Sequence, residues 1–117
     1  HYDLISKNCE IVPLFDETDK KYQKYAIDCL YALKEKIDVF EINTGAIARG
    51  YRTSPYPRAF IIKEMVKAGA LITIGSDCHD LNFLDCGFDL SVELCKSCGV
   101  KELQILTKGG FKGISLE

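Results

Sequence analysis

One stretch of ten residues, Leu71 to Asp80 (LITIGSDCHD), restricts the fold of this chain more than any other. Its first four residues are apolar or β-branched, and Gly75 and Ser76 follow at once, so the pattern predicts a buried parallel strand that ends in a tight turn. Residues i and i+2 of an extended chain point to the same side, so Asp77 and His79 can converge on one ion beyond the carboxyl end of this strand. A bland surface turn with a histidine is the alternative, because Asp-x-His is a short and common pattern.

Segments with strand patterns and helix patterns alternate along the chain. Apolar residues at spacings of three and four predict helices over about residues 19–36, 57–69 and 89–98. Short apolar runs predict strands over residues 37–43, 71–74 and 102–106, and the Gly-rich tail 107–117 has room for one more. This order is typical of an α/β fold with parallel strands and outer helices. About four strands cannot close a barrel, so we expect the chain to be a segment of a larger domain.

The composition narrows the classes of function. The 117 residues are 47% hydrophobic and 27% charged, which suits one modest globular domain in the cytoplasm. A net charge of -2 gives no basic field to attract nucleic acid. No apolar run approaches the ~20 residues needed to cross a bilayer, and no Gly-rich nucleotide-binding motif is present. We therefore expect no membrane partner and no long nucleic acid.

Six cysteines are an even number, as in disulfide-linked scaffolds. Several of them lie in helical apolar patterns, and no secretory signal is visible, so free thiols are the preferred interpretation. Cys95 and Cys98 have the spacing of redox or zinc sites, but no second pair completes four ligands. Core packing on one face of a helix is the better interpretation of this pair.

One carboxylate falls inside a predicted strand. Glu41 interrupts the otherwise apolar run IDVFEIN, and an isolated buried charge is costly. Glu41 therefore needs a partner. Burial inside a barrel near the site and a structural hydrogen bond are both consistent with the sequence.

The long loop at residues 46–57 carries Arg49 and Arg52 among hydroxyl-bearing side chains, and Arg58 follows it directly. A guanidinium group can donate two hydrogen bonds to two oxygens of a phosphate monoester. Arg49 and Arg52 are therefore candidate phosphate-binding residues, and Arg58 is a weaker one. The alternative is that these arginines only hold the loop by bonding to carbonyl groups.

The chain opens with His1 followed by Tyr2, Asp3, Leu4 and Ile5, which we expect to be the end of a strand with both aliphatic residues buried. A histidine in such a place is commonly just a polar terminus.

Three segments change that interpretation when they are taken together. IGSDCHD, the segment FEINTGAIARGYRTSPYP at residues 40–57, and HYDLI at the start occur in the same order in PHP-domain phosphoesterases. The chain resembles the C-terminal half of such a domain, and within the family it is most similar to histidinol-phosphatases. The resemblance implies that residues 1–117 are part of a distorted, TIM-like β/α barrel whose N-terminal half is absent from this sequence.

The resemblance also implies a chemistry. His1, Asp77 and His79 would be metal ligands, Asp77 and His79 would also be catalytic, and the complete domain would hold up to three divalent ions of zinc, manganese or iron. The expected reaction is hydrolysis of a small phosphate ester, L-histidinol phosphate, to L-histidinol and phosphate in histidine biosynthesis. The alternatives are a PHP enzyme for another phosphoester, such as a nucleotide, and a metal-binding module without activity. Without the N-terminal half, we expect the segment to be inactive.

Overall fold

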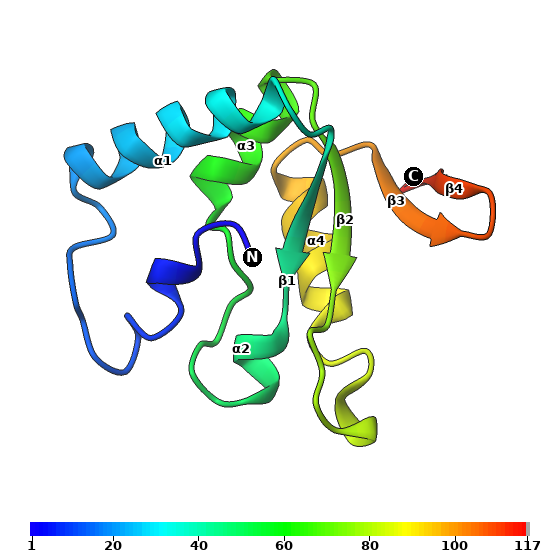
Figure 1. Cartoon of the computed structure of the whole chain (residues 1–117). Coiled ribbons are helices and arrows are strands. Elements are labelled where there is room, and N and C mark those ends of the chain that lie inside the picture. The colour runs from blue at the N-terminus through cyan, green and yellow to red at the C-terminus, as the bar shows by residue number, and fades with distance from the viewer. Residues whose placement is uncertain (117) are drawn as a thin grey trace.

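The computed structural model describes residues 1–116 as a mixed α/β structure (Figure 1). Strands β1 (Val39–Asn43) and β2 (Leu71–Gly75) pair in parallel, with Val39 opposite Leu71 and Asn43 opposite Gly75. The predicted parallel pair is therefore confirmed. The strands among these residues form two separate two-stranded sheets and no closed barrel.

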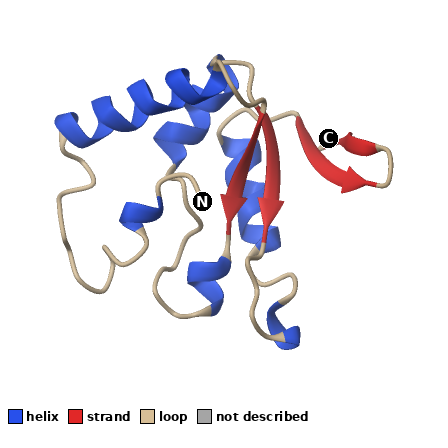
Figure 2. Ribbon diagram, viewed as in Figure 1, coloured by secondary structure: helices blue, strands red, loops and turns tan. Residues whose placement is uncertain are grey.

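Three longer helices accompany the parallel sheet: α1 (Lys20–Lys34), α3 (Ala59–Lys67) and α4 (Phe88–Ser97). Figure 2, in the view of Figure 1, shows α4 behind β1 and β2, α3 to the left of β1, and α1 above α3. Each of the three predicted helices is thus present, with bounds that differ by only a few residues. Asp19 caps the N-terminus of α1, because its carboxylate accepts hydrogen bonds from the backbone N–H groups of Lys21 and Tyr22.

The core lies between the parallel sheet and these helices. Its centre is formed by buried residues from all of these elements: Leu30, Phe40, Ile42, Ile61, Ile62, Met65, Ile72 and Cys95. Burial of each large aliphatic side chain contributes about 1.5–3 kcal/mol, which offsets part of the entropy lost on folding. All six cysteines are free thiols, and Cys95 and Cys98 pack into this core, as the sequence predicts.

At the C-terminal end both predicted strands are present but their pairing differs from the expected parallel sheet, and at the N-terminal end the expected strand is absent. Strand β3 (Glu102–Thr107) pairs antiparallel with β4 (Gly110–Ser115), so the last strands form a hairpin and do not extend the parallel sheet. The hairpin forms because Thr107 and Gly110 close a tight turn, in which Gly110 has a φ of 102°.

The N-terminal segment is not a strand end. Asp3 adopts a left-handed conformation with a φ of 65°, and the chain then enters a short 3-10 helix at Leu4–Ser6. The Ser6 hydroxyl donates to the Asp3 backbone carbonyl and carboxylate, which closes this turn. Leu4 and Ile5 are consequently exposed, with relative accessibilities of 44% and 66%.

The short helix α2 (Gly45–Ala48) opens the long arginine-bearing loop, which continues to α3. Its four residues are too few to show helical periodicity in the sequence. No helix in the described part of the chain has the length and apolar character required to cross a membrane.

Candidate metal centre

The carboxyl ends of β1 and β2 lie side by side. Asn43 and Gly75 pair across the two strands, and the backbone N–H of Thr44 donates to the Gly75 carbonyl at 3.0 Å. The turns that follow the two strands therefore begin at one edge of the sheet. Ligands of parallel α/β proteins bind outside this edge. Figure 1 shows the N-terminus beside β1, so His1 joins the same region.

The structure brings His1, Asp77 and His79 together. His1 Nε2 lies 3.5 Å from Asp77 Oδ2, and His79 Nε2 lies 3.6 Å from Asp77 Oδ1. These are the only two histidines in the sequence, and both flank the same carboxylate. The His1 and His79 side chains are 46% and 76% exposed, against 20% for Asp77. Two solvent-exposed imidazoles thus flank a mostly buried carboxylate.

The kinds of donor and their separations suit a divalent ion. Ligand atoms about 2.1 Å from a tetrahedral metal lie about 3.4 Å from one another, close to the separations between Asp77 and the two imidazoles. The imidazoles, however, face different carboxylate oxygens. Among residues 1–116, no three His, Cys, Asp or Glu side chains are placed to hold one ion together. The residues therefore fit part of a metal site, and among residues 1–116 these side chains do not complete one.

Arg49 fixes the charge and orientation of Asp77. Its Nη2 donates to Asp77 Oδ2 at 2.8 Å, and its Nη1 donates to the Asp77 backbone carbonyl at 2.9 Å. The hydrogen bond from this guanidinium lowers the pKa of Asp77 despite the opposing effect of burial. A carboxylate that is ionised so readily is a poor general base near neutral pH. The contact thus makes Asp77 a weaker base than an aspartate without a guanidinium partner.

Backbone geometry supports this contact. Asp77 has a φ of 45°, in the left-handed region that aspartate tolerates better than most residues. A Cβ atom at Gly45 would lie 2.7 Å from Arg49 Nη2 and 3.0 Å from Asp77 Cβ. The absence of a side chain at position 45 therefore lets Arg49 and Asp77 approach each other over the start of α2.

The other two arginines belong to a partly buried network of ion pairs with Glu17. Arg52 donates from Nη1 to Ser6 O and to Glu17 Oε1, and from Nε to Ser54 O, and its side chain is fully buried. Arg58 pairs with Glu17 through both of that residue's carboxylate oxygens. Burial raises the pKa of Glu17, but hydrogen bonds from Arg58 and Arg52 outweigh it and lower the pKa. These contacts match the alternative in which arginines hold the loop. That Arg52 also binds phosphate stays a prediction.

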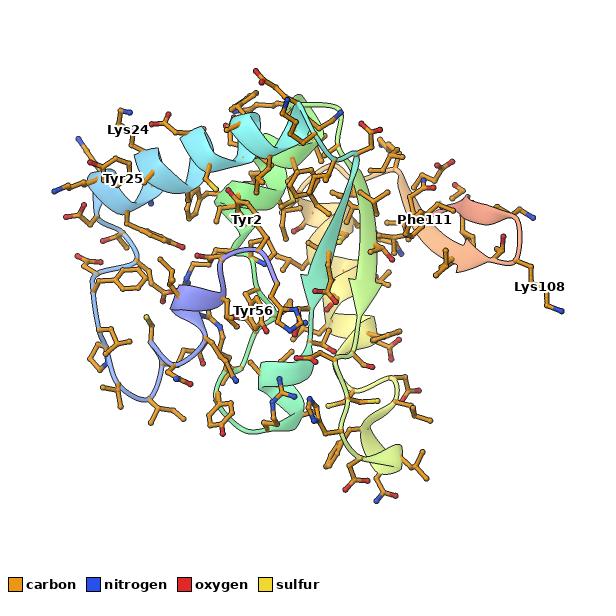
Figure 3. All side chains as sticks on the ribbon, viewed as in Figure 1. Tyr2, Lys24, Tyr25, Tyr56, Lys108 and Phe111 are labelled. Atoms are coloured by element: carbon orange, nitrogen blue, oxygen red, sulfur yellow. The ribbon has the colours of Figure 1, made fainter. Side chains whose placement is uncertain are left out.

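Three buried polar atoms near this edge of the sheet have no hydrogen-bond partner within residues 1–116: Thr44 Oγ1, Arg49 Nε and Tyr56 Oη. Unpaired buried groups of this kind are rare in native proteins and often mark a site. Tyr56, labelled in Figure 3, packs its ring against His1 edge to face, with ring centroids 6.5 Å apart. The Tyr56 hydroxyl is protonated at neutral pH, as in an ordinary tyrosine, and burial raises its pKa further.

The glutamate partners could not have been found from the sequence. Glu17 meets Arg52 and Arg58, and Glu10 accepts from the backbone and hydroxyl of Thr53. In the sequence, Glu10 and Glu17 have the appearance of exposed charged residues in a loop that contains Pro13. Their partners lie more than thirty residues further along the chain. Glu41 does have the partner that its place in a strand demands, because its Oε2 lies 3.2 Å from His1 Nδ1.

The fold and this edge define the class: a mixed α/β chain with imidazole, carboxylate and guanidinium groups gathered beyond parallel strands. A comparison with curated proteins adds a distant relative. The chain is 28% identical over 114 residues to a protein of Schizosaccharomyces pombe named "Probable histidinol-phosphatase". The match covers 93% of this chain but only 36% of that protein. No protein-family model and no solved structure matches the chain.

Proposed function

We propose that this chain is the C-terminal portion of a PHP-type domain that hydrolyses a phosphate monoester with the help of divalent metal ions. The observation that carries the proposal is the convergence of His1, Asp77 and His79, which come from two distant segments, at the carboxyl ends of parallel strands. The similarity to a protein named as a probable histidinol-phosphatase supports the same reaction. On this proposal the substrate is L-histidinol phosphate, the product is L-histidinol, and the enzyme acts in cytoplasmic histidine biosynthesis.

Each residue has a stated part in this reaction. His1, Asp77 and His79 hold metal ions, and zinc, manganese and iron all suit this mixture of imidazole and carboxylate. An ion held by these residues would supply Lewis-acid polarisation of the phosphoryl oxygens and a more acidic bound water. Arg49 orients Asp77, and its buried Nε, which has no hydrogen-bond partner among the described residues, is the donor proposed for a phosphate oxygen. His79, as the most exposed of the three, is also a candidate for proton transfer.

An apolar groove indicates where the rest of the domain packs. The groove has a volume of about 980 Å³ and runs between α1, the N-terminal segment and β1. Leu33, Ile37 and Ile5 line it, and all three are exposed within the described segment. Of the described residues, only Tyr56 bonds to the edge of β1 that faces away from β2, through a bridge at Asn43. On the proposed function, the N-terminal half of the domain covers this groove and supplies the remaining ligands.

The test of the function is a substrate comparison on the full-length protein. Metal content is measured first, followed by release of phosphate from histidinol phosphate, nitrophenyl phosphate and nucleotides. We expect bound metal and a strong preference for histidinol phosphate. Equal turnover of all substrates would contradict the assigned substrate, and metal without turnover would contradict the enzymatic reading altogether.

A second test concerns the phosphate contact. Arg49→Ala is expected to raise the KM for the phosphate ester by about 10-fold or more, because a charge-assisted hydrogen bond contributes about 1.5–3 kcal/mol. Steady-state kinetics of the full-length protein measure this effect, with Lys63→Ala on the exposed face of α3 as the control. If the KM stays at the unsubstituted value, Arg49 does not contact the phosphate.

A further inference from the structure

We propose that Glu41 is a positioning residue that holds the His1 imidazole with Nε2 directed at the candidate metal site. This inference rests on the proposed function, because it assigns a partner to one of the proposed ligands. The two ring nitrogens of His1 face different carboxylates: Nδ1 lies 3.2 Å from Glu41 Oε2, and Nε2 lies 3.5 Å from Asp77 Oδ2. Glu41 is therefore on the opposite side of the ring from Asp77.

The chemistry of imidazole assigns the proton. His1 Nδ1 faces two groups, the Glu41 carboxylate at 3.2 Å and the Asn43 amide nitrogen at 3.3 Å. Because the carboxylate is anionic and can only accept, and because the Asn43 amide already donates to Glu41 Oε2, Nδ1 carries the hydrogen and donates it to Glu41. With Nδ1 protonated, a neutral ring has its lone pair on Nε2, which is the nitrogen beside Asp77. Histidines that bind metals commonly donate their other N–H to a carboxylate, which fixes both the tautomer and the ring orientation. Glu41 supplies this carboxylate from the middle of β1.

The surroundings of Glu41 hold its carboxylate in place. The Asn43 amide nitrogen donates to Glu41 Oε2 at 3.2 Å. The Asn43 amide oxygen accepts from the backbone N–H of Gly45 at 3.0 Å, and Asn43 is fully buried, so the orientation of the amide is determined. This network gives Glu41 a fixed direction toward His1 rather than the freedom of a surface carboxylate.

Gly75 provides the space that the carboxylate occupies. Residue 75 belongs to β2, next to β1, and a Cβ atom there would lie 2.2 Å from Glu41 Oε1. Any side chain at this position would displace the end of Glu41. Glycine at position 75 therefore leaves room for the Glu41 carboxylate, in addition to its place before the turn.

A direct metal contact by Glu41 is the competing assignment, and a conservative substitution separates the two. The amide oxygen of glutamine still accepts a hydrogen bond from Nδ1, so Glu41→Gln retains much of the positioning effect. As a replacement for a metal ligand, glutamine loses the negative charge and most of the binding. A positioning role therefore predicts partial rescue by glutamine, whereas a ligand role predicts none.

Calorimetry measures the zinc Kd by titrating zinc into the metal-free full-length protein. NMR of the zinc-loaded full-length protein then records the signals of the His1 imidazole nitrogens. Glu41→Ala is expected to raise the Kd about 10- to 100-fold and to abolish the Nδ1–H signal. Glu41→Gln is expected to keep that signal and to raise the Kd less. Gly75→Ala is expected to raise the zinc Kd and to abolish the Nδ1–H signal as Glu41→Ala does, because it displaces the Glu41 carboxylate without removing it. If Glu41→Ala does not fold, Gly75→Ala provides the test. Glu93→Ala, at an exposed position of α4, is the control.

Two negative results have different meanings. Unchanged zinc affinity and an unchanged His1 signal in both Glu41→Ala and Gly75→Ala would overturn the role of Glu41 and leave the proposed function intact. Absence of zinc, manganese and iron binding by the unsubstituted protein would overturn the proposed function itself.

Discussion

Asp77→Ala is expected to lower kcat/KM of the full-length protein by about 10³-fold and to remove its bound metal. Asp77 is the residue on which the site converges, because it lies beside His1, His79 and Arg49 at once. A divalent ion contributes several kcal/mol of transition-state stabilisation, and about 4 kcal/mol corresponds to this loss in rate. The substitution also leaves Arg49 without its ionic partner. Metal analysis and steady-state kinetics on the same preparation measure both effects.

Asp85→Ala is the matched control for this substitution. Asp85 is an exposed carboxylate of the loop that follows β2, close in sequence to Asp77 but outside the converging group. We expect its metal content and kinetics to equal those of the unsubstituted protein. If Asp77→Ala kept full activity with its metal, the ligand assignment would be wrong.

Arg52→Ala is expected to lower the free energy of unfolding by about 3–5 kcal/mol, the usual cost of removing one partner from a buried ion pair. The Arg52 side chain is fully buried and donates to Glu17 and to the backbone carbonyls of Ser6 and Ser54. Its removal leaves the Glu17 carboxylate, which is only 11% exposed, without one of its two arginine partners. Denaturant unfolding, followed by circular dichroism, measures this loss.

The prediction for Arg52 separates a structural role from a phosphate-binding role. Lys63→Ala, which removes an exposed charge on α3, is expected to change the free energy of unfolding by no more than about 0.5 kcal/mol. An unfolding free energy within 1 kcal/mol of the unsubstituted value, together with a raised KM, would indicate that Arg52 binds the substrate and does not hold the loop.

Local patterns were sufficient for most of the helices and strands. Leu71–Gly75 is a strand because a short apolar run meets a glycine, and α1 is a helix because its apolar residues recur every three or four positions. Both signals depend on residues close together in the chain. Asp77 and His79 do lie close together, as predicted, but Asp77 has a φ of 45°, so the segment is not the extended chain on which that prediction rested.

Long-range pairings could not be read from the same patterns. Nothing near Arg52 in the sequence indicates that Glu17 is its partner, and nothing near Glu41 indicates that His1 Nδ1 faces it. The left-handed Asp3 was missed because its conformation is stabilised by Ser6 and by the Tyr22 hydroxyl on α1. Such contacts depend on how the elements pack, which single-sequence patterns do not specify.

The most direct measurement for the whole account is the anomalous scattering from crystals of the full-length protein grown with manganese. We expect a peak within about 2.0–2.4 Å of His1 Nε2 or His79 Nε2 and at the same distance from an Asp77 carboxylate oxygen. If the enzyme depends on manganese but every manganese peak lies away from these three side chains, the proposed metal site is wrong.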